Sequence, residues 1–498
     1  MEGVTVSSGI RWLLGITTLV YLVVIYWLSF LARKQIHTPE DYVVAGRRLP
    51  LSLAWATILA TWFGAGCMLT AADEVARGGL HRAALDPFGA GVCLLLAGAF
   101  FAKPLWRMKL LTICDFFARR FGRTAEVISA VILVPSYFGW VAAQFVALAG
   151  MYRLFFDIPM STGILLWAVV GTGYTLLGGM WSVTLTDALQ IALVIAGLIV
   201  LCIQALLQLG HGSLASGLTE LAGSLPPQDL MPIDIRSLGA FYAWLTAFII
   251  GALGNIPGQD LMQRIFAARS DRVAKWSCYV AGVLYLLLGV APILLGLVAK
   301  SLFPEDFKRA VLPALAHLFL SPVPLVIFII ALLSAVLSTV DSAILSPAVV
   351  LAQNIILRLK PNLPALAVNY VSVLVVAAGS VAMAFAGETA YQLLEDAYAL
   401  TLVGLFVPLT VGLFTNWGSS ASGLAAMIVG GGLWGIHYAL GWEFFLEPFL
   451  PQSLHVPFEV PITLCGALCY ALFAVIKIGA PAPVLREKVE MEPAYAKT

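Results

Sequence analysis

The chain has 498 residues, of which 61% are hydrophobic and only 11% are charged, and its formal net charge is +1 at pH 7. Its mean hydropathy of +0.95 excludes an ordinary soluble globular domain. The nearly balanced charge gives no reason to expect a nucleic-acid partner.

Long apolar stretches recur along the whole chain. A membrane-spanning helix needs roughly 20 predominantly apolar residues, and about thirteen stretches meet that length. They lie near residues 10–31, 50–74, 84–105, 126–152, 159–179, 183–208, 238–257, 277–302, 323–350, 365–387, 392–414, 420–440 and 457–478. A further apolar piece at 310–320 is too short to span and is expected at the surface. This pattern predicts an all-α polytopic membrane protein in a lipid bilayer.

Basic residues between the predicted spans indicate the orientation. With the N-terminus outside, most of the 28 lysines and arginines fall on the cytoplasmic side: Arg33, Lys34, Arg47, Arg48, Lys103, Arg107, Lys109, Arg119, Arg120, Arg123, Arg264, Arg269, Arg272, Lys275, Arg358, Lys360, Lys477, Arg486, Lys488 and Lys497. The opposite side holds Arg11, Arg77, Arg82, Arg153, Arg236, Lys300, Lys308 and Arg309. Because cytoplasmic loops carry an excess of Lys and Arg, we predict an N-out/C-in topology.

The cysteines and short motifs give no sign of enzymatic chemistry. The seven cysteines show neither metal-ligand spacing nor an extracellular pairing pattern, and we expect them to pack in the core: Cys67, Cys93, Cys114, Cys202, Cys278, Cys465 and Cys469. No nucleophile–base pair and no metal-binding set is recognisable, so we do not expect an enzyme.

Two predicted spans carry helix-breaking residues near their middle. Gly64 and Gly66 interrupt one span, and the segment 251–258, which contains several glycines and Pro257, interrupts another. Unwound backbone at membrane depth is tolerated only where it is buried in protein or lines a cavity. Broken spans in corresponding positions of two halves are typical of transporters with inverted repeats and a midplane site.

We therefore predict one transporter domain over residues 1–498, with two five-helix repeats at its core. Residues 1–49 form a leading helix and loop, 50–208 the first repeat and 238–414 the second. Residues 415–478 add further helices, and 479–498 form a cytoplasmic tail.

The span near 323–350 carries a row of small and hydroxyl-bearing residues along one helix face. Ala335, Ser338, Thr339 and Ser342 fall at i, i+3, i+4 and i+7, so they share one helix face, and Asp341 lies on a neighbouring face. A carboxylate inside a membrane is costly and therefore indicates function. Hydroxyls together with freed backbone carbonyls suit Na⁺, a hard cation that prefers oxygen. The alternative is that small residues allow close helix packing and the hydroxyls bond to their own backbone.

Several segments resemble a known family. They are Asp41-Tyr-Val-Val-Ala-Gly-Arg-Arg48, Ala60-Thr-Trp-Phe-Gly-Ala-Gly66, Phe100-Phe-Ala-Lys-Pro104, Tyr174-Thr-Leu-Leu-Gly-Gly-Met-Trp-Ser-Val-Thr-Leu-Thr-Asp187, Gly254-Asn-Ile-Pro-Gly-Gln-Asp-Leu-Met-Gln-Arg264 and Leu333-Ser-Ala-Val-Leu-Ser-Thr-Val-Asp-Ser-Ala-Ile-Leu345. Together they resemble the sodium/solute symporter family, and within it the high-affinity choline transporter branch. The resemblance implies a LeuT-like 5+5 inverted-repeat fold. It also implies a sodium site between the first and eighth core helices.

Carried over residue by residue, the resemblance implies which atoms surround the ion. They are the backbone carbonyls of Ala60, Phe63 and Ala335 and the side-chain oxygens of Ser338 and Thr339. The same resemblance adds chloride as a further candidate ion.

Acidic residues in or near the spans fall into two groups. By resemblance, Asp187 lies on the ion pathway, and Asp341 supports the sodium site or a second ion. The alternative for Asp187 is a helix N-terminal carboxylate stabilised by the helix dipole, and for Asp341 a buried hydrogen bond. Asp86, Glu395 and Asp396 are expected at the membrane interface: each lies near an apolar segment.

Tryptophans suggest where a solute binds. Trp62 and Trp140 lie away from the ends of their predicted spans, whereas most of the 13 tryptophans fit the bilayer interface. Indole faces attract ammonium groups, and both positions resemble members of the choline branch's aromatic cage. Gly258 and Ala90 stand where that branch has Trp and Tyr, so a bulkier or differently shaped solute is expected. The other candidate pocket residues are Tyr137, Gln144, Trp244 and Phe248.

These observations predict a Na⁺-coupled symporter that imports a small organic solute by alternating access across the plasma (inner) membrane. The candidate solutes are a quaternary amine or another small amine or amino-acid-like compound. The alternatives are a proton-coupled or uncoupled transporter of the same fold, or a non-transporting membrane sensor.

Overall fold

The computed structural model describes residues 7–303, 310–386, 389–451 and 456–479, which are largely helical and contain no β-strand. The helices are α1 Ser8–Ala32, α2 Pro39–Val44, α3 Leu51–Trp62, α4 Ala71–Gly78, α5 Ala90–Leu96, α6 Ala102–Arg107, α7 Cys114–Phe121, α8 Arg123–Phe156, α9 Met160–Leu209, α10 Leu214–Ser224, α11 Leu238–Ile249, α12 Gln259–Ala267, α13 Asp271–Leu302, α14 Val311–Phe319, α15 Pro322–Val350, α16 Leu357–Leu359, α17 Ala365–Ala384, α18 Ala390–Thr401, α19 Val407–Phe414, α20 Ser420–Leu440 and α21 Glu459–Val475. The predicted all-α architecture is therefore confirmed over the described residues.

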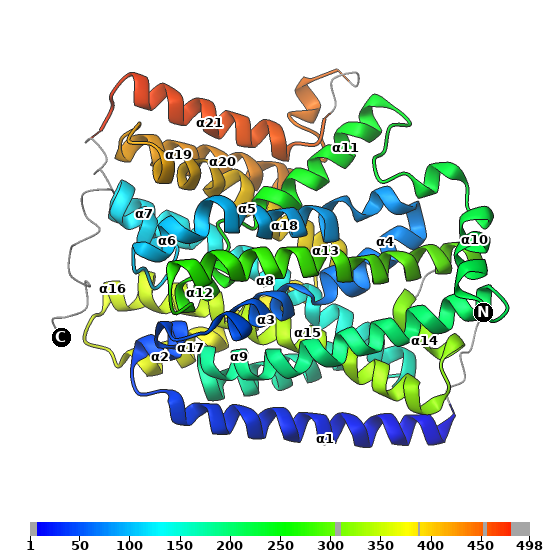
Figure 1. The fold of residues 1–498 in the computed structure, drawn as a ribbon. Helices are drawn as coiled ribbons and strands as arrows, with labels where there is room; N and C mark the ends of the chain where they lie inside the picture. The colour runs from blue at the N-terminus through cyan, green and yellow to red at the C-terminus, as the bar shows by residue number, and fades with distance from the viewer. Residues whose placement is uncertain (1–6, 304–309, 387–388, 452–455, 480–498) are drawn as a thin grey trace.

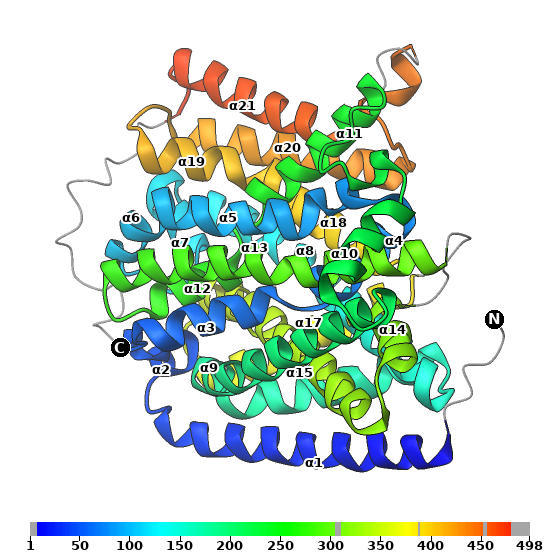
Figure 2. The same cartoon turned by 45° about the vertical axis from the view of Figure 1, so that its right-hand side comes forward.

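The long helices lie roughly alongside one another, with α1 at one edge and α21 at the opposite edge (Figures 1 and 2). The edge helices expose large apolar side chains: Trp12 on α1 is 74% exposed and Leu468 on α21 is 69% exposed. By contrast, every residue from Ala331 to Val350 on α15 is buried. The apolar surface faces outward and α15 lies in the interior, as expected for a helix bundle surrounded by lipid.

In the described part of the chain, ten helices are long and apolar enough to cross a membrane, or up to eleven when the bent pair Leu51–Trp62 and Gly66–Gly78 is one span. Each of the thirteen predicted stretches coincides with helix, and two of them, 159–179 and 183–208, lie on α9. The short piece 310–320 contains only the nine-residue α14. The number of spans and the N-out/C-in orientation stay predictions.

The helix α9 contains a non-helical residue, Gly179, and folds back on itself there. Before the break, the Tyr26 hydroxyl on α1 donates to the carbonyl of Val170 at 2.9 Å. After it, the side chain of Gln190 donates to the Tyr21 hydroxyl at 2.6 Å. A straight helix would separate Val170 from Gln190 by about 30 Å, whereas Tyr21 and Tyr26 are about 8 Å apart along α1. The backbone therefore reverses at Gly179, where φ is +51° and ψ is −152°.

The two predicted helix breaks are present. The helix axis bends by 53° between α3 and the segment Gly66–Gly78. The second span passes from α11 through a π-helical turn, Ile250–Gly254, and a short non-helical stretch before α12 begins at Gln259. The repeat boundaries predicted from these breaks stay a prediction.

Residues 41–48, the first segment that resembles the family, form the end of α2 and the turn that leads into α3. Asp41 completes a capping box with Thr38 at the start of α2 and pairs with Arg48 at 2.5 Å. Partial burial raises the pKa of Asp41, but hydrogen bonds from Thr38, His37 and Arg48 outweigh it and hold that pKa below its usual value. Tyr42 packs against the reversal at Gly179.

We predict that Gly179→Ala destabilises the protein by about 1–3 kcal/mol, because φ is positive there and a Cβ would lie 2.6 Å from Cδ2 of Tyr42. Thermal unfolding in detergent measures the effect. Gly150→Ala is the matched control: a Cβ on this helical glycine would meet no atom within 4 Å, so the stability of the variant should stay equal or rise. Equal melting temperatures for both variants would contradict the claim that the chain reversal at residue 179 requires glycine.

Candidate functional site

The end of α3 and the middle of α15 meet at the first helix break. Phe63, directly after α3, leaves helical geometry with φ −83° and ψ +48°. A Cβ on Gly64 would lie only 2.0 Å from Oγ1 of Thr339, so only glycine permits this approach. The Thr339 hydroxyl donates to the carbonyl of Thr61 at 2.8 Å. The contact joins the two elements on which the sequence places the sodium site.

The predicted sodium residues lie on these two facing elements. Ala60 and Phe63 belong to the end of α3 and the break, and both are buried. On α15, the Thr339 hydroxyl also lies 3.3 Å from the carbonyl of Ala335, and the Ser338 hydroxyl donates to Asp187. The structure brings the two halves of the predicted ligand set together, and sodium binding by them stays a prediction.

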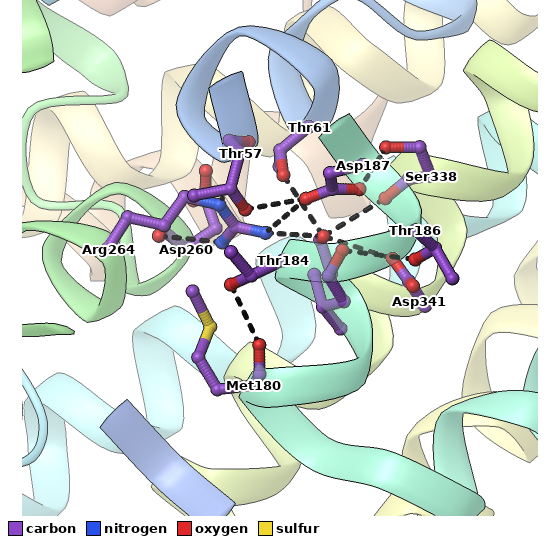
Figure 3. A network of polar contacts seen from close by, with 12 residues as sticks. Thr57, Thr61, Met180, Thr184, Thr186, Asp187, Asp260, Arg264, Ser338 and Asp341 are labelled. Atoms are coloured by element: carbon purple, nitrogen blue, oxygen red, sulfur yellow. Dashed lines mark hydrogen bonds and ion pairs between the residues drawn. The ribbon is translucent and has the colours of Figure 1, made fainter. Parts of the chain in front are cut away.

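Asp187 lies at the centre of this polar network (Figure 3). It is fully buried on the part of α9 that follows Gly179, and the Thr57 hydroxyl donates to its Oδ2 at 2.5 Å. The chain is helical on both sides of Asp187, so it is not a helix N-terminal residue. Its carboxylate instead joins α9 to α3 and, through Ser338, to α15.

Arg264 supplies the positive charge, and the position predicted for it from the sequence is wrong. It was expected in a cytoplasmic loop, but on α12 it is 1% exposed, with Nη2 3.9 Å from Oδ2 of Asp187. The same Nη2 donates to the Ser342 hydroxyl at 2.5 Å, and Nε donates to the carbonyl of Thr57 at 3.2 Å. Its apolar neighbours Leu261, Met262, Ile265 and Phe266 were a signal for burial, although Gln259, Asp260 and Gln263 offset them in hydropathy.

Asp341 is the second carboxylate of the network. It is fully buried, and its Oδ1 accepts a hydrogen bond from the Ser342 hydroxyl at 3.1 Å. Its Oδ2 has no hydrogen-bond partner in the described structure. The Ser342 hydroxyl also lies 3.0 Å from that of Thr61. Asp341 thus offers a free acceptor next to the α3–α15 contact.

The predicted solute residues Trp62 and Tyr137 meet at Asp260 on α12. The indole Nε1 of Trp62 donates to Oδ2 of Asp260 at 2.7 Å, and the Tyr137 hydroxyl donates to Oδ1 at 2.5 Å. The ring of Trp140 lies 5.4 Å from that of Tyr137. A Cβ on Gly258 would lie 2.9 Å from Oδ1 of Asp260 and 3.5 Å from the Tyr137 hydroxyl. These five residues form one cluster beside the polar network.

The remaining three candidates are placed differently. The side chain of Gln144 accepts from the backbone N–H of Ala65 at 2.9 Å, so it stabilises the first helix break. Trp244 and Phe248 stack on each other at 5.6 Å on α11 and are half-buried. No described ring contact joins them to Trp62 or Trp140, and their role in solute binding stays a prediction.

Two buried carboxylates near the solute cluster were not foreseen. Asp260 lay within a matching segment but was assigned no role. Asp86 was expected at the membrane interface, but it is 6% exposed and accepts a hydrogen bond from the Tyr285 hydroxyl at 2.6 Å. The ring of Tyr285 lies 6.4 Å from that of Trp62, so Asp86 borders the same cluster.

Comparisons with known proteins show the family and the fold of the chain. A model of the sodium:solute symporter family matches residues 42–430. The chain is 30% identical to the human "High affinity choline transporter 1" over 79% of this chain and 70% of that protein. It is 22% identical to the Escherichia coli "Sodium/pantothenate symporter" over 87% and 92%. The structure of a Na⁺-coupled sialic acid symporter superimposes with a TM-score of 0.78 at 18% sequence identity. The match covers 96% of this chain and 99% of the symporter chain, which shows a shared LeuT-like fold.

We predict that Arg264→Gln destabilises the protein by about 3 kcal/mol or more, since it leaves the buried Asp187 without its cation. Adding Asp187→Asn should recover much of this loss, because the two charges of the pair are then removed together. Chemical or thermal unfolding of the purified variants measures both effects.

The matched control is the exposed ion pair Arg107–Asp271, in which the arginine side chain is 52% exposed. Arg107→Gln should change stability by no more than about 1 kcal/mol. A double variant of Arg264 and Asp187 no more stable than the single Arg264 variant would rule out the buried pair as the cause.

Proposed function

Because the chain belongs to the sodium:solute symporter family, we propose that it imports a small organic solute into the cell, coupled to Na⁺, by alternating access at the site between α3 and α15. The observation that carries this proposal is the contact of Thr339 with the carbonyl of Thr61, at 2.8 Å, across the first helix break. It sets the hydroxyl face of α15 against the end of α3, where helical hydrogen bonding stops.

We assign the sodium ligands to five oxygens from these two elements. They are the carbonyls of Ala60, Phe63 and Ala335 and the hydroxyls of Ser338 and Thr339. An oxygen-only set suits a hard monovalent cation better than a transition metal. The Ser338 hydroxyl donates a hydrogen bond to Asp187, which leaves the lone pairs of the serine oxygen free for the ion.

The two carboxylates would tune this site. Asp187 holds Ser338 in place and is balanced by Arg264 at 3.9 Å. The Oδ2 atom of Asp341 has no hydrogen-bond partner among the described residues. It would bind a second cation directly, or its charge would attract the sodium ion across the site. Both residues are thus proposed members of the ion pathway.

Coupling follows when each ligand favours the same conformation. Sodium would tie α15 to the end of α3, and the solute would bind near Trp62 on that same helix and near Trp140. Each ligand then raises the affinity of the other by the same factor, as linkage requires. Opening of the α3–α15 contact on the inner side would release both.

The proposed substrate is a small organic solute, and an amine is the favoured class. Relatives named for choline and pantothenate indicate organic solutes, and the indoles of Trp62 and Trp140 favour an amine. The proposed location of the protein is the plasma (inner) membrane. A symporter of this kind catalyses no chemical step. No residue is assigned to chloride.

We predict that the double substitution Ser338→Ala and Thr339→Ala abolishes sodium-stimulated uptake in proteoliposomes while the protein still inserts, because two of the five ion ligands are lost. Replacing Na⁺ by K⁺ in the same assay should stop uptake by the wild-type protein.

Ser277→Ala is the matched control. This serine on α13 is fully buried, and its hydroxyl donates to the carbonyl of Ala274 at 2.9 Å. The variant should keep sodium-dependent uptake. Undiminished Na⁺-dependent uptake by the double variant would refute the ligand assignment.

A further inference from the structure

Asp260 is a buried carboxylate in the middle of the solute cluster, 2% exposed. Its two oxygens accept hydrogen bonds from the side chains of Trp62 and Tyr137. Neither donor carries a charge. The role of this carboxylate depends on its protonation and on which cation balances it.

The hydrogen-bond directions around Asp260 are those of an ionised carboxylate. The Tyr137 hydroxyl accepts from the backbone N–H of Asp260 at 2.9 Å, so its single proton points to Oδ1. The indole N–H of Trp62 can only donate, and it points to Oδ2. With these directions both oxygens of Asp260 accept and neither carries a hydrogen, which is the pattern of an ionised carboxylate.

The nearest cation, Arg264, is engaged elsewhere. Its Nη1 reaches only the backbone carbonyl of Asp260, at 3.0 Å, and its Nη2 faces Ser342 and Asp187. Among the described residues, no ion pair is formed by the carboxylate of Asp260. A buried carboxylate whose two side-chain donors are both neutral lacks a balancing charge, so a cation from outside the chain would stabilise it.

The surroundings suit an organic cation. Trp62, Trp140 and Tyr398 are buried, with 7%, 7% and 8% of their surfaces exposed. The rings of Trp140 and Tyr398 lie 6.3 Å apart, and aromatic faces attract ammonium groups. A Cβ on Gly258 would lie 2.9 Å from Oδ1 of Asp260, so glycine at this position lets the backbone approach the carboxylate. The carboxylate retains lone pairs for further donors, which an N–H group can supply.

We propose that the solute is a small organic cation that keeps at least one N–H on its nitrogen, and that Asp260 binds this group while Trp62 and Trp140 cover its apolar part. The assignment rests on the proposed function, since it concerns the solute subsite of the symporter. It makes Asp260 a residue that determines specificity.

Thermal shift of the purified protein tests the assignment with a matched ligand series. The probes are ethanolamine, N-methylethanolamine, N,N-dimethylethanolamine and choline, with the neutral 3,3-dimethyl-1-butanol and the anion pantothenate. In Na⁺ buffer, the three amines with N–H should raise the melting temperature more than choline, and the neutral and anionic compounds should not.

Variants then locate the effect. Asp260→Asn should weaken binding of the amines at least about tenfold, as expected for a charge-assisted hydrogen bond, and keep the sodium shift. Asp260→Glu should keep the preference for cations. Asp115→Asn is the control, because Asp115 is a buried carboxylate that accepts from the backbone of Leu111 and Thr112, outside this cluster.

Several results would overturn the assignment. They are equal shifts by choline and the N–H amines, a shift by pantothenate or the neutral alcohol, no shift by any amine, or unchanged amine binding in Asp260→Asn. If that variant does not fold, the wild-type series alone still decides. A sodium shift that persists without any response to amines removes the amine and leaves sodium symport intact, whereas absence of any sodium response removes the proposed function itself.

Discussion

The architecture depends on the close approach of α15 to the end of α3. A helix cannot come this near a neighbouring backbone when a side chain lies between them, and at Gly64 even a methyl group would overlap Thr339. The approach also requires α3 to end, since the Thr61 carbonyl accepts its hydrogen bond from Thr339. The break in one helix and the small-residue face of the other are therefore two parts of one contact.

Buried charge constrains the same region. Asp187, Asp260 and Asp341 lie within or beside the network, and Arg264 is the described cation that reaches it (Figure 3). Burying several carboxylates against one guanidinium is unfavourable unless other cations complete the balance. A membrane protein whose cargo includes cations gains stability from that cargo, so an acidic interior of this kind is compatible with transport. It would be a defect in a purely structural core.

The sequence was informative where a local rule decides the outcome. Helical periodicity placed Ser338 and Thr339 on one face, and glycine and proline chemistry located both breaks. Arg264 was misplaced because α12, a polar nine-residue helix, follows a break and resembles a loop in hydropathy. Asp86 was misjudged because its burial depends on Tyr285, 199 residues away in the chain. Such long-range contacts leave no periodic signal.

The helix α12 connects the two proposed subsites, one for the solute and one for the ion. Asp260 and Arg264 are four residues apart, so their side chains leave the same face of the helix one turn apart. Asp260 contacts the aromatic residues of the solute cluster, whereas Arg264 contacts Asp187 and Ser342 in the ion network. Because a single helical turn is stiff, a shift of α12 that adjusts one subsite must move the other. The proposed coupling between solute and ion then needs no long pathway, since one rigid turn belongs to both proposed subsites.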